Sequence, residues 1–353
     1  MKKTRAVRAG VVTIGGGAPV SIQSMANTDT RDLAATSAQI VALAEAGCEL
    51  VRVSVFDREA AANVRALVDK SPVPLVADIH FDHHLAILAA EGGISKLRIN
   101  PGNLKSEQAV RQVVDAAKAH HIPIRVGVNS GSVPREIRVR DHGVTAQGLV
   151  DSALGHIRLL EKEGFFDIVV SLKASGVRLT VEAYRLASRT FDYPLHLGVT
   201  EAGLPGHGTI KSAIGIGALL IDGIGDTVRV SLTGSPLPEV KAAQDILKAL
   251  GLRGGVEVIS CPTCGRTRVD VEAVAKSVEA RTRHIQADIK VAVMGCPVNG
   301  PGEALGADIA LCGGNGQSAL YLKGAFVRKV TGDPEEELMA FLSEYLAKQR
   351  EDG

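Results

Sequence analysis

The cysteines toward the C-terminal end of the chain have a spacing that can hold a metal. Cys261-Pro-Thr-Cys264 is a C-x-x-C pair, and Cys296 follows in a loop rich in glycine and proline. Three thiolates and one further ligand can hold either a zinc ion or an iron–sulfur cluster. Cys312 and Glu303 are both candidates for the fourth ligand. The second C-x-x-C pair of a zinc ribbon is missing, but the spacing still leaves a zinc-stapled small domain as the alternative.

A second group of polar residues lies at the ends of short β-branched runs in the first part of the chain. Because the carboxyl ends of barrel strands converge on one mouth, these residues predict a shared site. Arginine and lysine side chains at such a mouth form an anion site, whereas a single arginine there is often only a solvated rim residue. The members are Arg52, Asp78, Arg98, Arg125, Asn129, Lys173, Thr200, Glu201, Arg229 and Ser231.

The elements that carry these residues alternate between short strands and Ala-rich amphipathic helices. Eight such units, with crossovers long enough for parallel pairing, predict a (β/α)₈ TIM barrel in an α/β protein. A doubly wound open sheet is the second choice. The predicted strands are Pro19–Ser24, Glu49–Val55, Val73–Ala77, Ser95–Ile99, Ile122–Val128, Asp167–Leu172, Tyr193–Val199 and Thr227–Ser231.

After Leu250 the pattern changes to a small α+β domain with the cysteine loops, short strands and a terminal helix. We therefore predict two domains, residues 1–250 and 251–353. The first would bind the substrate at the barrel mouth and the second would bind the metal. A scaffold or metal-sensing module without catalysis is disfavoured, because it has no need for a charged barrel mouth.

Composition excludes several classes of protein. The chain has 353 residues, with 40 Lys+Arg against 39 Asp+Glu, so it is not a globally basic nucleic-acid binder. No run approaches the ~18 apolar residues of a membrane helix. The charged N-terminus lacks the apolar stretch of a signal peptide, which predicts a cytoplasmic protein that binds neither membrane nor nucleic acid.

Eight segments in order give the chain a family resemblance. They are QSMANTDTRD (Gln23–Asp32), VADIHF (Val76–Phe81), LRINPGN (Leu97–Asn103), RVGVNSGS (Arg125–Ser132), SLKAS (Ser171–Ser175), GVTEAG (Gly198–Gly203), CPTCGR (Cys261–Arg266) and MGCPVNGPGEA (Met294–Ala304). Together they resemble the 4-hydroxy-3-methylbut-2-enyl diphosphate synthase family of the methylerythritol phosphate route to isoprenoids.

The resemblance implies an oxidoreductase acting on CH or CH₂ groups. It would reductively open 2-C-methyl-D-erythritol 2,4-cyclodiphosphate and expel a hydroxyl as water. It would use a 4Fe–4S cluster in a ferredoxin- or sulfite-reductase-like domain, with ferredoxin or flavodoxin as electron donor. It also implies a head-to-tail homodimer, in which one chain's cluster domain closes over the partner's barrel mouth.

The resemblance also assigns roles to individual residues. Cys261, Cys264 and Cys296 would ligate three irons, and Glu303 rather than Cys312 would be the exchangeable ligand of the fourth. Glu201, beside Thr200, would protonate the departing hydroxyl, and Asp78 would contact the substrate hydroxyls. The diphosphate would be bound by Arg52, Arg98, Arg125, Asn129, Lys173, Arg229 and Ser231.

Two alternatives compete with parts of this interpretation. A barrel transferase of the pterin-binding type with a zinc-stapled C-terminal domain would also collect anionic substrates at the barrel mouth. The histidines of the DIHFDHH segment are possible metal ligands, but His83 and His84 begin a predicted helix, and adjacent residues do not share a helix face. Glu201 is alternatively a salt-bridge partner for one of the arginines.

Overall fold

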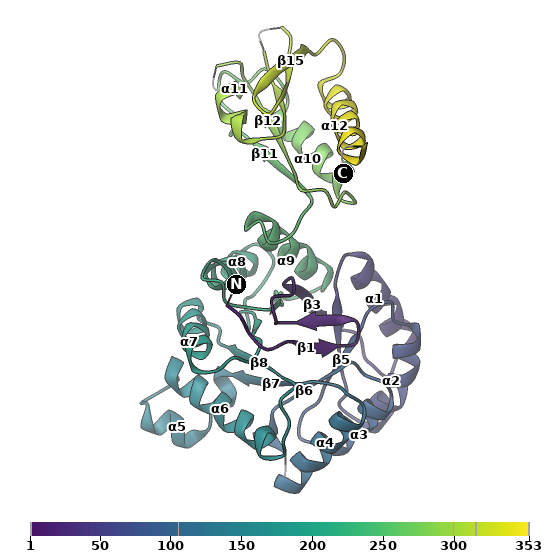
Figure 1. The fold of residues 1–353 in the computed structure, drawn as a ribbon, viewed down its shortest axis with the longest axis vertical. Coiled ribbons are helices and arrows are strands. Elements are labelled where there is room, and N and C mark those ends of the chain that lie inside the picture. Colours follow the sequence, from purple (N-terminus) through teal and green to yellow (C-terminus); the bar gives the residue numbers. More distant parts are fainter. Residues whose placement is uncertain (1, 105, 299, 315, 352–353) are drawn as a thin grey trace. The chain divides into compact units, whose positions relative to one another are not determined.

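The computed structural model describes residues 2–104, 106–298, 300–314 and 316–351. The chain divides into two compact units, Met1–Leu250 and Gly251–Gly353 (Figure 1). Within the described residues, no helix has the length and apolar character needed to cross a membrane.

The first unit is a barrel of parallel strands, as the alternating pattern predicts. Its sheet runs in the order β8-β7-β6-β5-β4-β3-β10-β9, and a bridge from Val170 to Leu195 joins the two ends of that order. This closure excludes the open doubly wound sheet. The strands are β3 (Ser21–Met25), β4 (Leu50–Ser54), β5 (Leu75–Asp78), β6 (Lys96–Ile99), β7 (Ile124–Asn129), β8 (Ile168–Lys173), β9 (His196–Leu197) and β10 (Thr227–Val228).

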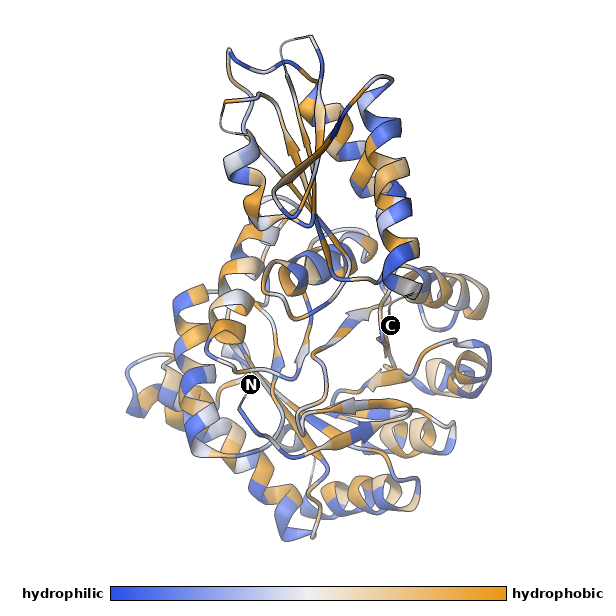
Figure 2. Cartoon of the chain, turned by 45° about the horizontal axis from the view of Figure 1, so that its top comes forward, coloured by the Kyte–Doolittle hydropathy of each residue, from blue (hydrophilic) through white to orange (hydrophobic). Residues whose placement is uncertain are grey.

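Amphipathic helices surround the barrel, and Figure 2 shows apolar and polar residues alternating along them. Several begin at a side chain that accepts a hydrogen bond from a first-turn N–H, including Asp32, Asp57 and Ser106. The helices are α1 (Leu33–Glu45), α2 (Arg58–Lys70), α3 (His83–Glu91), α4 (Glu107–Ala119), the short α5 (Arg135–Arg140), α6 (Ala146–Lys162), α7 (Val177–Thr190), α8 (His207–Ile221) and α9 (Leu237–Ala249).

An antiparallel hairpin, β1 (Val7–Ala9) and β2 (Val12–Ile14), packs against the amino-terminal part of the barrel interior. Its buried Val7, Ala9 and Ile14 form one apolar cluster with Leu50, Val76 and Val169. The β-strand pattern of this hairpin is only three residues long on each side, and we did not predict it from the sequence. It provides the apolar base on which the polar mouth is built.

The β8–β9 seam contains an inserted side chain. The Val170 N–H donates to the Pro194 carbonyl at 2.9 Å, which is an ordinary contact between parallel strands. At the following position the buried Tyr184 hydroxyl of α7 accepts from the Leu172 N–H at 3.1 Å and donates to the His196 carbonyl. The phenol therefore replaces a direct strand-to-strand hydrogen bond next to the mouth.

The second unit contains a five-stranded mixed sheet in the order β11-β12-β13-β14-β15. The first three strands are parallel and the last two are antiparallel. Helices α10 and α12 contribute to the same apolar core as the sheet. The elements are β11 (Val256–Ser260), α10 (Val271–Thr282), β12 (Ile289–Met294), the one-turn α11 (Gly300–Glu303), β13 (Ile309–Cys312), β14 (Ala319–Leu322), β15 (Ala325–Lys329) and α12 (Pro334–Glu351).

Candidate active site

A polar pocket of about 220 Å³ opens at the carboxyl ends of the barrel strands. It brings together every residue predicted to bind substrate, and Ser171 and His80 line it as well. Its lining residues are Arg52, Asp78, His80, Arg98, Arg125, Asn129, Ser171, Lys173, Thr200, Arg229 and Ser231.

Asp78 is the one carboxylate among the described residues that line this pocket, and two guanidinium groups flank it. Arg98 Nη1 donates to Asp78 Oδ1 at 3.0 Å, and Arg52 Nε lies 3.8 Å from Asp78 Oδ2. Burial alone would raise the pKa of Asp78. The charges of Arg52 and Arg98 and a hydrogen bond from His80 outweigh it and hold the pKa below its usual range. Asp78 is therefore ionised at neutral pH.

The pocket has more positive than negative charge. A second carboxylate beside the pocket, that of Glu239, pairs with Arg229 at 3.4 Å. Five formal cations thus face two carboxylates, which leaves three positive charges without a counter-charge among the described residues of the site. Burial lowers the pKa of Arg52 to about 9, and the neighbouring Arg229 and Arg98 add repulsion. A multiply charged anion would relieve this repulsion.

Two of these five cations, Arg125 and Lys173, are buried in the pocket. Arg125 is 2% exposed, and its Nε and Nη1 atoms have no hydrogen-bond partner among the described residues. Burial, followed by the charges of Arg125 and Arg229, lowers the pKa of the Lys173 ammonium well below its ordinary value. Buried donors without partners are costly, so their natural partner is a bound ligand.

Two glycines make space for these long side chains on the inward face of the strands. A Cβ at Gly127 would lie 2.9 Å from Arg98 Nε, and a Cβ at Gly198 would lie 2.9 Å from Lys173 Nζ. A Cβ at Gly198 would also lie 2.6 Å from the Arg229 carbonyl oxygen, a backbone atom that cannot move aside as a side-chain end can. The RVGVN and LGVTEAG segments therefore need glycine for steric reasons.

Glu201 does not line the pocket. It follows β9 directly after Thr200, is exposed, and has a φ of 51°, in the left-handed region that non-glycine residues rarely adopt. Among the described residues, no ion pair joins it to an arginine, so its alternative role as a salt-bridge partner has no support. Strained backbone of this kind is concentrated at functional sites.

The predicted metal ligands surround a separate cavity of about 130 Å³ in the second unit. Its lining residues are Cys261, Pro262, Cys264, Arg266, Met294, Gly295, Cys296, Gly300 and Glu303. Cys312 is not among them. It is a buried residue of β13, where burial raises the pKa of its thiol to about 12. Glu303 thus lines the same cavity as the three cysteines that are predicted to be ligands, whereas Cys312 belongs to the adjoining apolar cluster against which Cys261 packs.

Hydrogen bonds around the cavity favour thiolates. The Gly295 N–H donates to Cys261 Sγ at 3.1 Å. Backbone and side-chain hydrogen bonds from Arg266 lower the pKa of the Cys264 thiol. N–H groups directed at sulfur are characteristic of iron–sulfur sites, where they also tune the potential.

The spacing of the ligands tests the two candidate metal groups. Around one zinc ion, sulfurs at about 2.3 Å from the metal lie roughly 3.8 Å apart. Among the described residues, the one set of three or more potential ligands within 4.8 Å of one another is Asp82, His83 and His84, so the cysteines and Glu303 do not form such a set. Any three of them therefore include at least one pair of ligand atoms more than 4.8 Å apart, which is wider than the spacing around one zinc ion.

The ligand atoms of Asp82, His83 and His84 lie within 4.8 Å of one another, although adjacent residues in a helix point to different faces. His83 and His84 are the first two residues of α3. Asp82 is the N-cap of that helix. Its Oδ1 accepts from the His84 N–H at 3.0 Å and lies 3.1 Å from the His84 Nδ1. A capping role accounts for the position of Asp82 without a metal.

Sequence reasoning missed two residues of the barrel site. Ser171 lies two positions before Lys173 on β8, and the two-residue period of a strand would have found it. Glu239 lies in the first turn of α9 and is 3% exposed. Nothing in the SPLPEV segment indicates that its side chain reaches Arg229.

These features define a two-domain TIM-barrel protein with a cationic mouth and a separate cysteine-lined cavity. Family models match both parts: the GcpE TIM-barrel domain over residues 4–244 and the GcpE protein C-terminal domain over residues 257–348. The chain belongs to the GcpE family.

Curated relatives match over nearly their whole length, and three of them share the name 4-hydroxy-3-methylbut-2-en-1-yl diphosphate synthase (flavodoxin). The protein of Caldanaerobacter subterraneus subsp. tengcongensis is 54% identical over 348 residues, 98% of this chain and 97% of its own. That of Clostridium perfringens is 53% identical over 96% of each chain. That of Geobacter sulfurreducens is 53% identical over 98% of this chain and 99% of its own.

Proposed function

We propose that this chain converts 2-C-methyl-D-erythritol 2,4-cyclodiphosphate to 4-hydroxy-3-methylbut-2-enyl diphosphate. The names of its relatives support the activity and flavodoxin as the electron donor. The observation that carries the proposal is the surplus of positive charge in the barrel pocket. A multiply charged anion would balance this charge and would accept hydrogen bonds from Arg125 Nε and Nη1, which have no partner among the described residues.

The reaction takes up two electrons and two protons and releases one water. A ring C–O bond to the diphosphate and a C–OH bond both break, and a C=C bond forms. A 4Fe–4S cluster held by Cys261, Cys264, Cys296 and Glu303 would supply single electrons and a Lewis-acidic iron. The remaining tasks belong to the barrel residues.

The barrel residues bind and orient the substrate. Arg52, Arg98, Arg125, Lys173 and Arg229 hold the diphosphate, and charge-assisted bonds from fixed guanidinium groups set its depth in the mouth. Asn129, Thr200 and Ser231 supply neutral hydrogen-bonding groups. Asp78, held ionised between Arg52 and Arg98, accepts hydrogen bonds from the substrate hydroxyls.

Glu201 is the proposed acid for the departing hydroxyl. Its exposed carboxylate and left-handed backbone support a role that needs access rather than packing. E201Q should lower product formation while pyrophosphate binding stays unchanged. A variant with the wild-type rate would remove Glu201 from the mechanism.

Metal analysis tests the cluster. Protein purified without oxygen should be brown and contain about four irons per chain. Colourless protein with one zinc would contradict the cluster and favour a zinc-stapled domain. E303A should lose turnover and C312S should retain both iron and turnover. The reverse result would make Cys312 the fourth ligand.

We also propose a cytoplasmic homodimer in which each cysteine-bearing unit acts on the partner's barrel. The family resemblance supports this arrangement, and reduced thiols favour the cytoplasm. Mixing a barrel variant, R125M, with a ligand variant, C264S, should restore part of the activity that each lacks alone. Mixtures without activity, under conditions where subunits exchange, would contradict a site shared between chains.

A further inference from the structure

Glu239 is a buried carboxylate beside the barrel mouth to which the proposed reaction gives no role. It lies on the first turn of α9 with 3% exposure and lines a second cavity of about 500 Å³, which it shares with Arg229. A buried carboxylate at such a position needs a reason, because its desolvation is costly unless it is fully paired.

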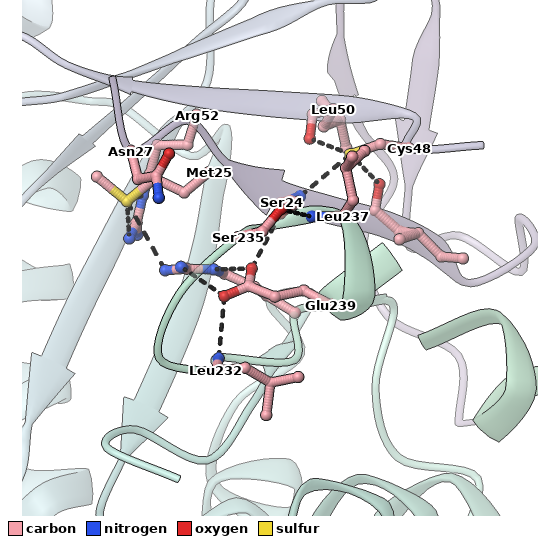
Figure 3. A network of polar contacts seen from close by, with 12 residues as sticks. Ser24, Met25, Asn27, Cys48, Leu50, Arg52, Leu232, Ser235, Leu237 and Glu239 are labelled. Carbon is pink, nitrogen blue, oxygen red and sulfur yellow. Dashed lines mark hydrogen bonds and ion pairs between the residues drawn. The ribbon is translucent and has the colours of Figure 1, made fainter. Parts of the chain in front are cut away.

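The carboxylate of Glu239 is fully paired, as Figure 3 shows from close by. Its Oε2 accepts from the Ser24 hydroxyl at 2.9 Å and from Arg229 Nε at 3.4 Å. Its Oε1 accepts from the Leu232 N–H at 3.0 Å and from Arg229 Nη2 at 3.4 Å. Ser24 belongs to β3 and Leu232 follows β10, so two neighbouring barrel segments fix the carboxylate.

This pairing fixes the orientation of Arg229. The carboxylate takes the Nε–Nη2 edge of the guanidinium, so the Nη1 end remains for other contacts. Arg229 Nη1 lies 3.7 Å from Met25 Sδ, and the same sulfur accepts from Arg52 Nε at 2.9 Å and Arg52 Nη2 at 2.7 Å. Glu239 and Met25 thus hold two guanidinium groups of the pocket in a fixed relation.

We propose that Glu239 is a positioning residue that sets Arg229 for a ligand with two linked phosphates. The inference rests on the proposed function and deepens it. Two fixed guanidinium groups can each engage one phosphate of a diphosphate, whereas inorganic phosphate gains little from their spacing. Glu239 therefore determines how strongly the barrel prefers a diphosphate to a single phosphate.

Charge and positioning predict opposite effects of removing Glu239. If the carboxylate acted only through its negative charge, E239Q would strengthen anion binding. The gain would be larger for pyrophosphate, which carries more charge than phosphate. If it positions Arg229, E239Q frees the guanidinium and lowers the selectivity for pyrophosphate. E239D keeps the charge and should recover part of that selectivity.

The experiment measures the dissociation constants of inorganic pyrophosphate and inorganic phosphate by titration calorimetry. It uses anaerobically purified full-length protein in buffer without divalent cations. The preference for pyrophosphate over phosphate should fall about tenfold in E239Q, because the Arg229 guanidinium keeps its charge but loses its fixed orientation. S24A removes one hydrogen-bond donor to Glu239, so it should lower the preference for pyrophosphate by less than E239Q does. If E239Q does not fold, S24A is used as the test variant instead.

Asp226 gives the matched control. It is also a buried carboxylate of the barrel, 6% exposed, but it accepts from the Thr4 hydroxyl and the Leu195 N–H before the start of β10. D226N should lower stability and leave the preference for pyrophosphate unchanged. A preference that is unchanged or higher in E239Q would overturn the role of Glu239. Wild-type protein that binds both anions equally well would instead overturn the diphosphate site itself.

Discussion

The hydroxyl of Tyr184 offers a direct test of how the barrel is closed beside its pocket. Tyr184 is fully buried, and its hydroxyl accepts from the Leu172 N–H and donates to the His196 carbonyl. Y184F removes this one oxygen and keeps the ring that packs around it. The backbone groups of Leu172 and His196 then lose their partner in the β8–β9 seam.

The expected cost follows from those two groups. A buried backbone donor or acceptor without a partner costs about 1–3 kcal/mol. The phenylalanine ring prevents a direct strand-to-strand bond, so we expect a loss of about 3 kcal/mol for the pair. For a unit of this size, that loss lowers the melting temperature by about 6–12 °C. Lys173 directly follows Leu172, so pyrophosphate affinity should fall as well.

Far-UV circular dichroism is the assay, because the sequence contains no tryptophan. Y193F is the control: Tyr193 is a buried residue whose partly buried hydroxyl donates to the Glu161 side chain at 2.7 Å and to no strand carbonyl among the described residues. Its loss should be about 1.5 kcal/mol, the lower end for a hydrogen bond to a charged group, because this bond is only partly buried. If Y184F loses no more than Y193F, the inserted hydroxyl does not stabilise the seam and the reasoning fails.

Three further predictions concern single side chains. Burial lowers the pKa of His156 to about 4, below its unfolded value of about 6.5. The neutral imidazole therefore contributes stability above pH ~6.5, and this contribution is lost as the pH falls from ~6.5 toward 4. H156Q should make the urea midpoint depend less on pH between these two values. The Lys96 ammonium is fully buried without a hydrogen-bond partner among the described residues, and burial lowers its pKa. K96M should therefore stabilise the protein by about 1–4 kcal/mol near neutral pH and by less above pH ~10, where the unfolded lysine is also neutral; a lower melting temperature would contradict this. M25L keeps the side-chain volume but removes the sulfur that accepts from Arg52. Pyrophosphate affinity should fall, while the free energy of unfolding should change by less than about 1.5 kcal/mol. An affinity equal to that of the wild type would show that the sulfur does not position Arg52.

The sequence predicted the barrel well because its strands and helices differ in period and length. All eight predicted barrel strands have counterparts in the structure, with ends shifted by a few residues. The hairpin Val7–Ile14 was missed because its strands are too short to show alternation. The seam at Tyr184 was also missed, since a helical tyrosine gives no sign that its hydroxyl enters a sheet.

The pocket was predictable in part for a similar reason. Strand ends such as Arg98 and Arg125 converge whenever a barrel forms, so topology alone brings them together. Glu239 reaches the pocket from a helix, and its contacts depend on loop geometry that no periodicity encodes. Likewise, the residues alone left both Glu303 and Cys312 as candidates for the fourth ligand; the family resemblance favoured Glu303, which lines the cavity of the second unit with the three cysteines.

Turnover under anaerobic conditions tests the central claim most directly. Iron-loaded protein is incubated with 2-C-methyl-D-erythritol 2,4-cyclodiphosphate and reduced flavodoxin, and the phosphorus-containing products are followed by NMR. We predict one 4-hydroxy-3-methylbut-2-enyl diphosphate for every two electrons consumed, and no product when the reductant is omitted. Iron-loaded protein that leaves the cyclic diphosphate unchanged, or that opens it equally well without reductant, would contradict the account.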